Sequence, residues 1–347
     1  MIAAGGTAGH VLPALAVAEA LSERGVFVSF AGSPDRVEAR LVPEAGYELD
    51  SFRISGLPRR PGPALLGALV RAAAAPGGCR AILRRRRADV VFGAGGYVSG
   101  PMVLAAGSMR VPAALSEADA QLGLANRLAL PFARRVFLAY PLPGRGGPRY
   151  SVVGRPIPAR ARAIPALEAR EIFELPRAGP VLLVAGALAG ARALNELAIE
   201  AFGEVGPAVL HISGERDYPE LRTRLRRADY RLIPSTERIG AAYSAADLIL
   251  ARAGSSVWEI AAAGKPAILV PYPFATGDHQ AKNAAHFVRA GGAIMIRELA
   301  LDQAPDRVRS LLRDRDALAR MAEAMRAAAR PDAAEEIAEG LIALAAA

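Results

Sequence analysis

Short runs of apolar residues alternate with amphipathic stretches along the whole chain. After an initial apolar stub of three residues, eight runs predict β-strands, at 26–32, 88–96, 111–117, 133–140, 179–186, 207–214, 246–254 and 265–273. Most are continuously apolar, which is typical of parallel strands covered on both faces. Helical stretches such as PALAVAEALSERG and VWEIAAAG lie between them and stop at glycine. This βαβ alternation, present twice, predicts an α/β fold of two Rossmann-like domains, each with a doubly wound parallel sheet.

The chain of 347 residues is long enough for two such domains. A stretch rich in Pro and Arg without periodicity predicts a linker at 154–168, which leaves one domain at 1–153 and another at 169–330. A final helix is expected at 331–347, set off by Pro331. No apolar run approaches the roughly 20 residues of a membrane-spanning helix, and no signal-peptide pattern is visible, so we expect a cytosolic protein.

The net charge of +9 would ordinarily suggest an anionic partner. The chain has only two lysines, Lys265 and Lys282, so nearly all of the positive charge is arginine and reflects a compositional bias. Aromatic residues make up only 5%, which is poor for stacking on bases, and we expect no nucleic-acid partner. The single cysteine, Cys79, excludes an internal disulfide and a cysteine-based metal cluster, and we expect it to be a small core residue.

Four glycine-rich loops follow predicted strands and open predicted helices. They read GGTAGH (5–10), GGYVSGP (95–101), AGALAGAR (185–192) and RAGSSVWE (252–259). Backbone N–H groups at such helix starts favour phosphate groups, although GGTAGH matches neither the dinucleotide nor the P-loop pattern. Four loops at strand carboxyl ends, divided between two Rossmann-like halves, predict one cleft between two domains.

Two side chains beside these loops could take part in chemistry. His10 falls in the first turn of its helix, where it could accept a proton from a substrate, although its spacing equally fits a capping or packing histidine. Glu259 lies about one turn into the last helix, where a carboxylate can accept both hydroxyls of a ribose.

Taken together, the motifs resemble the MurG family of transferases. The resemblance rests on GGTAGHVLPALAVAEAL, the run 35–60, DVVFGAGGYVSGP, the block 241–273 and DHQAKNA, and it covers essentially the whole chain in order. It implies a GT-B fold whose last helix returns to the first domain. It also implies inverting transfer of GlcNAc from UDP-GlcNAc to the C4 hydroxyl of MurNAc in undecaprenyl-pyrophosphoryl-MurNAc-pentapeptide (lipid I), which gives lipid II for peptidoglycan synthesis. The reaction would need no metal or other cofactor.

The resemblance also assigns roles to individual residues. The catalytic residues would be His10, as the base, and Glu117. The acceptor would be bound by Gly5, Gly6, Gly96, Tyr97, Ser99 and Gly100. The donor would be bound by Thr7, Ala8, Gly9, Asp119, Asn126, Gly186, Leu188, Gly190, Ile239, Arg252, Gly254, Ser255, Ser256, Glu259, Gln280 and Asn283. Within this set, the backbone of Ile239 would read uracil, Glu259 the ribose and Gln280 the GlcNAc hydroxyls, while Arg252 would stabilise the departing UDP.

The family's members dock on the cytoplasmic face of the cell membrane as peripheral proteins, so a lipid-linked acceptor, that membrane face and other cell-wall enzymes are the expected partners. The apolar residues that could dock here are Leu65, Leu66, Leu69 and Val70, among Arg59, Arg60, Arg71, Arg80 and Arg84 to Arg87. A packed helix with a solvated arginine end explains part of the same pattern, because four consecutive arginines cannot share one helical face.

Several positions depart from the family pattern. Ala8 replaces a glycine, the HEQN stretch reads Ser116 to Asp119 (SEAD), and the GGSQGA loop reads GALAGA from Gly186. Pro158 stands where the family has an arginine, and Arg155 is a nearby substitute. Two alternatives therefore remain open: a related GT-B glycosyltransferase with another acceptor, or a catalytically weak homologue that acts as a cell-wall scaffold.

Overall fold

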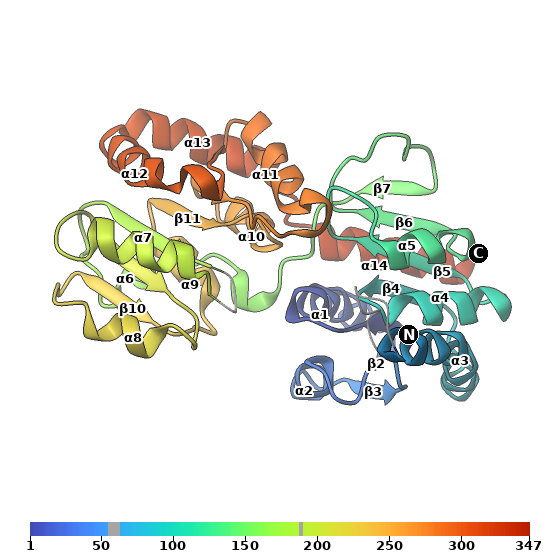
Figure 1. Ribbon diagram of the computed structural model, residues 1–347. Helices are drawn as coiled ribbons and strands as arrows, with labels where there is room; N and C mark the ends of the chain where they lie inside the picture. The colour runs from blue at the N-terminus through green and yellow to red at the C-terminus, as the bar shows by residue number, and fades with distance from the viewer. Residues whose placement is uncertain (55–62, 187–189) are drawn as a thin grey trace. The chain divides into compact units, whose positions relative to one another are not determined.

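A computed structural model describes residues 1–54, 63–186 and 190–347, with only the backbone given for 63–73. The chain forms two compact units (Figure 1). Unit 1 comprises Met1–Pro158 and Pro331–Ala347, and unit 2 comprises Ala159–Arg330. The segment expected to be a linker is divided between them, since the residues from Ala159 onward, including the short helix η2 (Ala159–Ala161), belong to unit 2.

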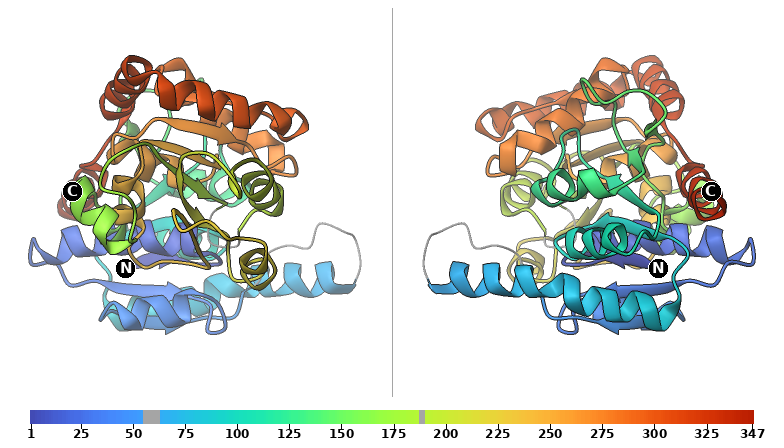
Figure 2. Two further views of the ribbon diagram at one scale, coloured as in Figure 1. Left: turned by 90° about the vertical axis from the view of Figure 1, so that its left-hand side faces the viewer. Right: turned by 90° about the vertical axis from the view of Figure 1, so that its right-hand side faces the viewer.

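Unit 1 contains a sheet of seven parallel strands in the order β3-β2-β1-β4-β5-β6-β7. The strands are β1 (Ile2–Ala4), β2 (Ser29–Gly32), β3 (Glu48–Ser51), β4 (Val91–Gly95), β5 (Ala113–Glu117), β6 (Arg135–Leu138) and β7 (Tyr150–Val152). The helices are α1 (Ala8–Ser22), α2 (Glu38–Glu44), α3 (Pro63–Arg86), α4 (Ser99–Ser108), α5 (Leu124–Ala129), η1 (Leu130–Phe132) and α14 (Ala333–Ala346). Figure 2 shows α3, a helix of 24 residues, in light blue.

Unit 2 repeats this arrangement with six parallel strands in the order β10-β9-β8-β11-β12-β13. The strands are β8 (Val181–Ala185), β9 (Ala208–Ile212), β10 (Tyr230–Ile233), β11 (Leu248–Arg252), β12 (Ala267–Val270) and β13 (Ala293–Met295). The helices after η2 are α6 (Ala166–Ile172), α7 (Arg192–Phe202), α8 (Tyr218–Thr223), α9 (Ile239–Ala245), α10 (Ser256–Ala262), η3 (Thr276–Asp278), α11 (His279–Arg289), η4 (Glu298–Gln303), α12 (Ala304–Arg313) and α13 (Arg315–Ala328). Both sheets therefore have Rossmann strand order, which confirms the predicted fold class.

The sheet of unit 1 is covered by apolar clusters on both faces. One cluster joins α1, the central strands and α14, and the other joins α3, α4 and the strands β4 to β6. Cys79 lies fully buried in the second cluster, where burial raises the pKa of its thiol to about 12. The last helix, α14, packs on α1 through Ile337, Ala338 and Leu341, so the end of the chain belongs to unit 1.

The initial apolar stub forms β1, and all eight predicted runs contain a strand, each shorter than the run that predicted it. Four strands were missed: β3, β7, β10 and β13. Each of the four lies at the edge of its sheet, and most of their residues are only partly buried. Among the helices of the described ranges, none is both long and apolar enough to span a membrane.

Candidate active site

The four glycine-rich loops lie at the switch points of the two sheets. In unit 1 they follow β1 and β4, and in unit 2 they follow β8 and β11. Each pair of strands is adjacent in its sheet, at the place where the strand order reverses. Ligands of open α/β sheets bind in the crevice outside the carboxyl ends of such strands. The topology thus places the two loops of each unit side by side, at the carboxyl ends of the two central strands.

The two loops of unit 1 are in direct contact. A Cβ at Gly96, which has a φ of +78°, would collide with the carbonyl oxygen of Gly5. A Cβ at Gly6 would lie 2.9 Å from Cε1 of Tyr97. The Tyr97 hydroxyl is buried and finds no hydrogen-bond partner in the described parts of the chain. The two loops assigned to the acceptor therefore pack against each other, and the buried hydroxyl of Tyr97 lies unsatisfied beside them.

A buried glutamate, Glu38, supports the loop 5–10; its role was not predicted from the sequence. Glu38 is fully buried, and its carboxylate accepts the N–H of Gly6 at 2.9 Å and that of Ser33 at 3.0 Å. Its side chain fills the space beside Gly5 and Gly32, where a Cβ would collide with it. The only sequence signal is an acidic residue within the run 35–60. Gly6 therefore uses its N–H to shape the loop, and that group is not free for a substrate phosphate.

His10 lies in the first turn of α1, between the two loops. Its Nδ1 is 3.1 Å from Oγ1 of Thr7, and a Cβ at Gly95 would lie 2.5 Å from its Cδ2. Desolvation, helped by the positive charge of Arg155, lowers the pKa of the imidazole to about 4, while Asp119 acts in the opposite direction. The ring is therefore neutral at physiological pH and can accept a proton.

Arg155 occupies a position beside the same loop. Its side chain is 7% exposed, and its guanidinium donates a hydrogen bond to the carbonyl of Gly9. From the sequence, this arginine was expected to substitute for the one missing at Pro158. The structure places its charge next to His10, where it acts on the titration of the ring.

Glu117 organises the segment that replaces the family's HEQN stretch. It is 5% exposed and accepts hydrogen bonds from the N–H of Gly123 at 2.8 Å, the N–H of Asp119 at 3.2 Å and Nδ2 of Asn126 at 2.9 Å. Asn126 Nδ2 also donates to the carbonyl of Ser116 at 2.9 Å. Burial raises the pKa of the Glu117 carboxyl, and these hydrogen bonds oppose the rise. The contacts favour a positioning role, and its catalytic role stays a prediction.

Ser99 and Gly100, both assigned to the acceptor, open α4. Ser99 Oγ accepts the N–H of Gly95 at 2.8 Å and lies within donating distance of the carbonyls of Ala3 and Gly95, at 3.0 and 2.8 Å. This fully buried hydroxyl fixes the turn between β4 and α4. Gly100 faces the backbone of Ala125, since a Cβ at this glycine would lie 3.8 Å from the carbonyl oxygen of Ala125.

In unit 2, the turn Gly254–Ser255–Ser256 leads from β11 into α10, which carries Glu259 in its first turn. The hydroxyl of Tyr243 on α9 donates a 2.9 Å hydrogen bond to Oε2 of Glu259. Within the described ranges, Oε1 has no hydrogen-bond partner. One oxygen of this carboxylate is thus fixed by the protein and the other is available to a ligand.

Gln280 approaches the same turn from α11. Its Oε1 accepts the N–H of Tyr272 at 2.9 Å, which fixes the orientation of the amide because a backbone N–H can only donate. Its Nε2 lies 3.8 Å from the position that a Cβ at Gly254 would take. The amide NH₂ therefore points to the turn as a donor, which suits a sugar hydroxyl.

Arg252, expected to stabilise the departing UDP, already has partners in this structure. The side chain is 7% exposed and forms an ion pair with Glu298. It also makes long hydrogen bonds of 3.4 Å to the carbonyls of Val270 and Pro271, and its guanidinium lies 5.5 Å from the ring centre of Tyr272. To reach a phosphate group, it would have to give up some of these contacts.

The loop that opens α7 is tightly packed at both of its described glycines. A Cβ at Gly186 would collide with the N–H of Ala191, and one at Gly190, which has a φ of +73°, would collide with the carbonyl of Ser213. Leu188 lies outside the described residues.

The other residues assigned to the donor lie at helix starts or in a helix. Thr7, Ala8 and Gly9 form the start of α1, Ile239 is the first residue of α9, and Asn283 is buried in α11.

The side chains of the apolar residues expected to dock on the membrane, Leu65, Leu66, Leu69 and Val70, lie outside the described residues. At the other end of α3, Arg85 and Arg86 each lie 2.6 Å from the carboxylate of Asp50, and Arg86 also pairs with Glu48. Two of the four consecutive arginines are thus paired within the protein.

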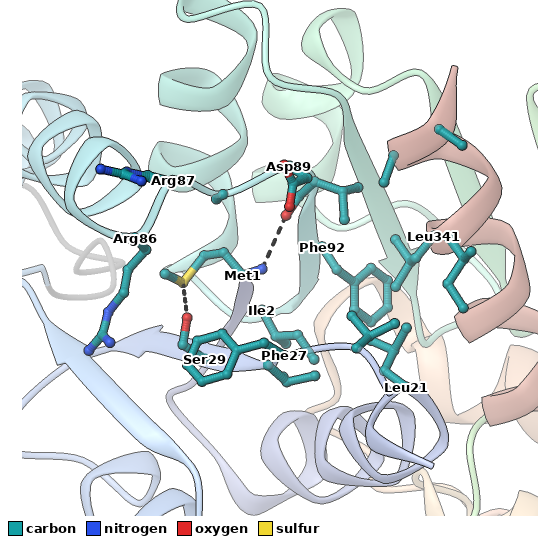
Figure 3. A pocket seen from close by; sticks show the side chains of 17 residues that line it. Met1, Ile2, Leu21, Phe27, Ser29, Arg86, Arg87, Asp89, Phe92 and Leu341 are labelled. Atoms are coloured by element: carbon teal, nitrogen blue, oxygen red, sulfur yellow. Dashed lines mark hydrogen bonds between the residues drawn. The ribbon is translucent and has the colours of Figure 1, made fainter. Parts of the chain in front are cut away.

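A cavity of about 490 Å³ in unit 1 is separate from these loops (Figure 3). It is lined by Met1, Phe27, Asp89 and Leu341, among others, and lies at the amino ends of β1, β2 and β4. The glycine-rich loops of unit 1 lie at the carboxyl ends of its strands. The cavity therefore lies at the opposite ends of these strands. No group of three or more His, Cys, Asp or Glu in the described ranges is placed to hold a metal ion.

Comparison with known proteins agrees with this arrangement. The Glycosyltransferase family 28 N-terminal domain matches residues 1–138, and the Glycosyltransferase family 28 C-terminal domain matches residues 181–337. A protein of Acidithiobacillus ferrooxidans is 44% identical over 99% of this chain and 96% of its own length, and one of Halorhodospira halophila is 41% identical over 97% and 96%. Both are named UDP-N-acetylglucosamine–N-acetylmuramyl-(pentapeptide) pyrophosphoryl-undecaprenol N-acetylglucosamine transferase.

A solved structure supports the same assignment. The crystal structure of MurG from Acinetobacter baumannii is 29% identical, covers 99% of both chains and has a TM-score of 0.81 to this chain. The resemblance seen in the motifs is thereby confirmed over the full length. The chain belongs to glycosyltransferase family 28 and is a transferase of the MurG type.

Proposed function

We propose that this protein transfers GlcNAc from UDP-GlcNAc to the C4 hydroxyl of MurNAc in lipid I, with inversion, and so produces lipid II for peptidoglycan synthesis. The observation that carries the proposal is the similarity, over nearly the whole chain, to transferases named for this reaction. The two loops of unit 1 and the Glu259–Gln280 site of unit 2 supply groups that suit the acceptor and the donor.

In the proposed reaction, His10 acts on the acceptor. Its neutral imidazole takes the proton of the C4 hydroxyl as the oxygen attacks the anomeric carbon of GlcNAc. The new bond joins the acceptor oxygen to that carbon, and the bond from the same carbon to the β-phosphate oxygen of UDP breaks. The electron pair leaves with UDP, and attack opposite the leaving group inverts the anomeric centre.

Unit 2 would hold the donor through the fixed groups around α10. Glu259 would accept the ribose hydroxyls, and the oriented NH₂ of Gln280 would donate to a GlcNAc hydroxyl. The first backbone N–H groups of a helix have no partner within it, so those of the turn 254–256 can stabilise the charge that develops on UDP. The first N–H of α9, at Ile239, likewise has no partner within its helix and would read the uracil ring.

We also propose that the reaction proceeds without a metal ion and that the protein acts as a peripheral protein on the cytoplasmic face of the cell membrane. The names of the relatives support the second point, because the acceptor that they name is anchored by undecaprenol. Other cell-wall enzymes are proposed partners, on the ground that lipid II must be handed to later steps.

The decisive experiment measures transfer of labelled GlcNAc from UDP-GlcNAc to a short-chain lipid I analogue in the presence of EDTA. We expect a disaccharide product, together with nearly complete loss of turnover and near-normal UDP affinity in His10→Ala. Clear UDP binding by calorimetry without transfer would overturn the proposed acceptor. Transfer that appears only after Mg²⁺ is added back would overturn the metal-free chemistry.

A further inference from the structure

Tyr243 is a buried residue of unit 2 that lies within the block 241–273 but has no role in the proposed reaction. Its side chain is 3% exposed, and its hydroxyl donates a 2.9 Å hydrogen bond to Oε2 of Glu259. A buried tyrosine hydroxyl needs a partner, and this one takes it from a different helix, 16 residues along the chain. The bond therefore links α9 to the carboxylate that would face the donor.

Helix α9 is fixed at its C-terminal end. The ammonium group of Lys265 donates to the carbonyls of Ser244 and Ala246, both at 2.9 Å. The hydroxyl of Ser244 accepts the N–H of Ile164 at 3.0 Å. These contacts hold the last turn of α9, which carries Tyr243, against two other segments of the same unit.

The first turn of α9 is fixed as well. Gly240 lies so close to the backbone that a Cβ there would collide with the carbonyl of Arg162. Contacts at both ends of α9 favour one orientation of the helix, in which the Tyr243 hydroxyl is directed at Glu259. The donor site is then organised before any ligand arrives, and such preorganisation lowers the entropic cost of binding.

We infer that Tyr243 is a positioning residue for the donor nucleotide, holding Glu259 Oε2 so that Oε1 and the remaining lone pair of Oε2 meet the two hydroxyls of a ribose. The inference rests on the proposed use of a UDP-sugar. It predicts that Tyr243 sets the preference of the protein for a ribonucleoside diphosphate over its 2′-deoxy analogue. Burial and the neighbouring carboxylate raise the pKa of Tyr243 well above its usual value, so the hydroxyl keeps its proton throughout the neutral range.

The test compares UDP and 2′-deoxy-UDP binding by calorimetry in the wild-type protein and in Tyr243→Phe. A carboxylate that is no longer held in place should lose one of its charge-assisted hydrogen bonds to the ribose, which weakens UDP binding roughly 10-fold. Binding of 2′-deoxy-UDP should change much less, so the preference for ribose falls. In the transfer assay, KM for UDP-GlcNAc should rise by a similar factor while kcat stays within about twofold, since the contact is equally present in ground and transition states.

Two further variants separate positioning from a general loss of structure. Tyr230→Phe removes another buried tyrosine hydroxyl of unit 2, which lies 2.9 Å from Nδ1 of His211, and should leave the ribose preference unchanged. In a Glu259→Gln background, Tyr243→Phe should have little further effect on that preference. An unchanged ribose preference in Tyr243→Phe, or an equal loss for both nucleotides, would overturn the inference and leave the proposed function intact. Ribose preference without transfer to lipid I would overturn the function alone.

Discussion

The protonation of His10 gives the most direct test of the proposed reaction. Burial and Arg155 lower the pKa of its ring to about 4, from an ordinary value of 6.5. At pH 7 only about one ring in a thousand is then protonated. A base loses its activity as the pH falls through its pKa, so kcat/KM should remain level from pH 7 down to about 5 and decline around pH 4.

The same reasoning predicts a difference between the two kinetic profiles. The profile of kcat/KM reports the free protein, whereas that of kcat reports the complex. The bound pyrophosphate of lipid I would bring negative charge near the ring and raise the pKa of His10. The acid limb of kcat should therefore lie at a higher pH than that of kcat/KM. Neither pyrophosphate titrates in this range, because both are diesters.

Arg155 provides a matched pair of variants. Arg155→Gln keeps a donor for the Gly9 carbonyl and removes the charge, while Arg155→Lys keeps the charge. One pKa unit corresponds to about 1.4 kcal/mol, so a partly screened charge interaction of about 0.7–1.4 kcal/mol moves a pKa by half a unit to one unit. We expect the acid limb of Arg155→Gln to rise by roughly half a unit to one unit, and that of Arg155→Lys to stay in place.

The assay is initial-rate transfer to a short-chain lipid I analogue between pH 4 and 8. Activity is measured again at pH 7 after exposure to each acidic buffer, which identifies irreversible loss. A wild-type limb of kcat/KM near pH 6.5 would refute the lowered pKa and the neutral ring of His10. An identical limb in the residual activity of His10→Gln would show that another group is the base.

Three further predictions concern other parts of the two units. Glu38→Gln keeps the shape of the side chain but can accept only one of the two buried N–H groups, so unit 1 should lose about 1.5–3 kcal/mol of stability. Amide exchange at Gly6 should accelerate, and unchanged exchange together with an unchanged melting temperature would contradict the role given to the carboxylate. Gln280→Ala removes the donor NH₂, so KM for UDP-GlcNAc should rise about 10-fold while the Kd of UDP stays the same; an equal loss for both would place Gln280 away from the sugar. His211 is fully buried, and burial lowers the pKa of its ring to about 3. The unfolded chain therefore takes up a proton as the pH falls below about 6.5 while the folded chain does not, so stability declines between about pH 6.5 and 3, by up to about 5 kcal/mol. Urea unfolding followed by the fluorescence of Trp258, the single tryptophan, should show a weaker pH dependence in His211→Gln, and equal slopes would contradict it.

The sequence alone determined the central architecture of both units. The strands at the middle of each sheet are continuous apolar runs because helices cover both of their faces, and all of them were found. The glycine-rich loops were found because the turns after such strands need glycine where the backbone comes close, as at Gly96 against Gly5. The edge strands β3, β7, β10 and β13 were missed, since an edge strand pairs on one side only and here has most of its residues partly in water, which leaves no apolar run to detect.

The supporting contacts of the site were decided only by the tertiary structure. Glu38 lies 32 residues from Gly6, and Tyr243 lies 16 residues from Glu259, so neither pair leaves a periodic trace in the sequence. The ion pair of Arg252 with Glu298 is likewise formed between distant segments. Hydrophobic periodicity indicates which positions along the chain are buried. It does not indicate which two side chains come close enough to form a hydrogen bond. The order of the parallel strands in each sheet decides which side chains become neighbours. These neighbours are therefore known only from the tertiary structure.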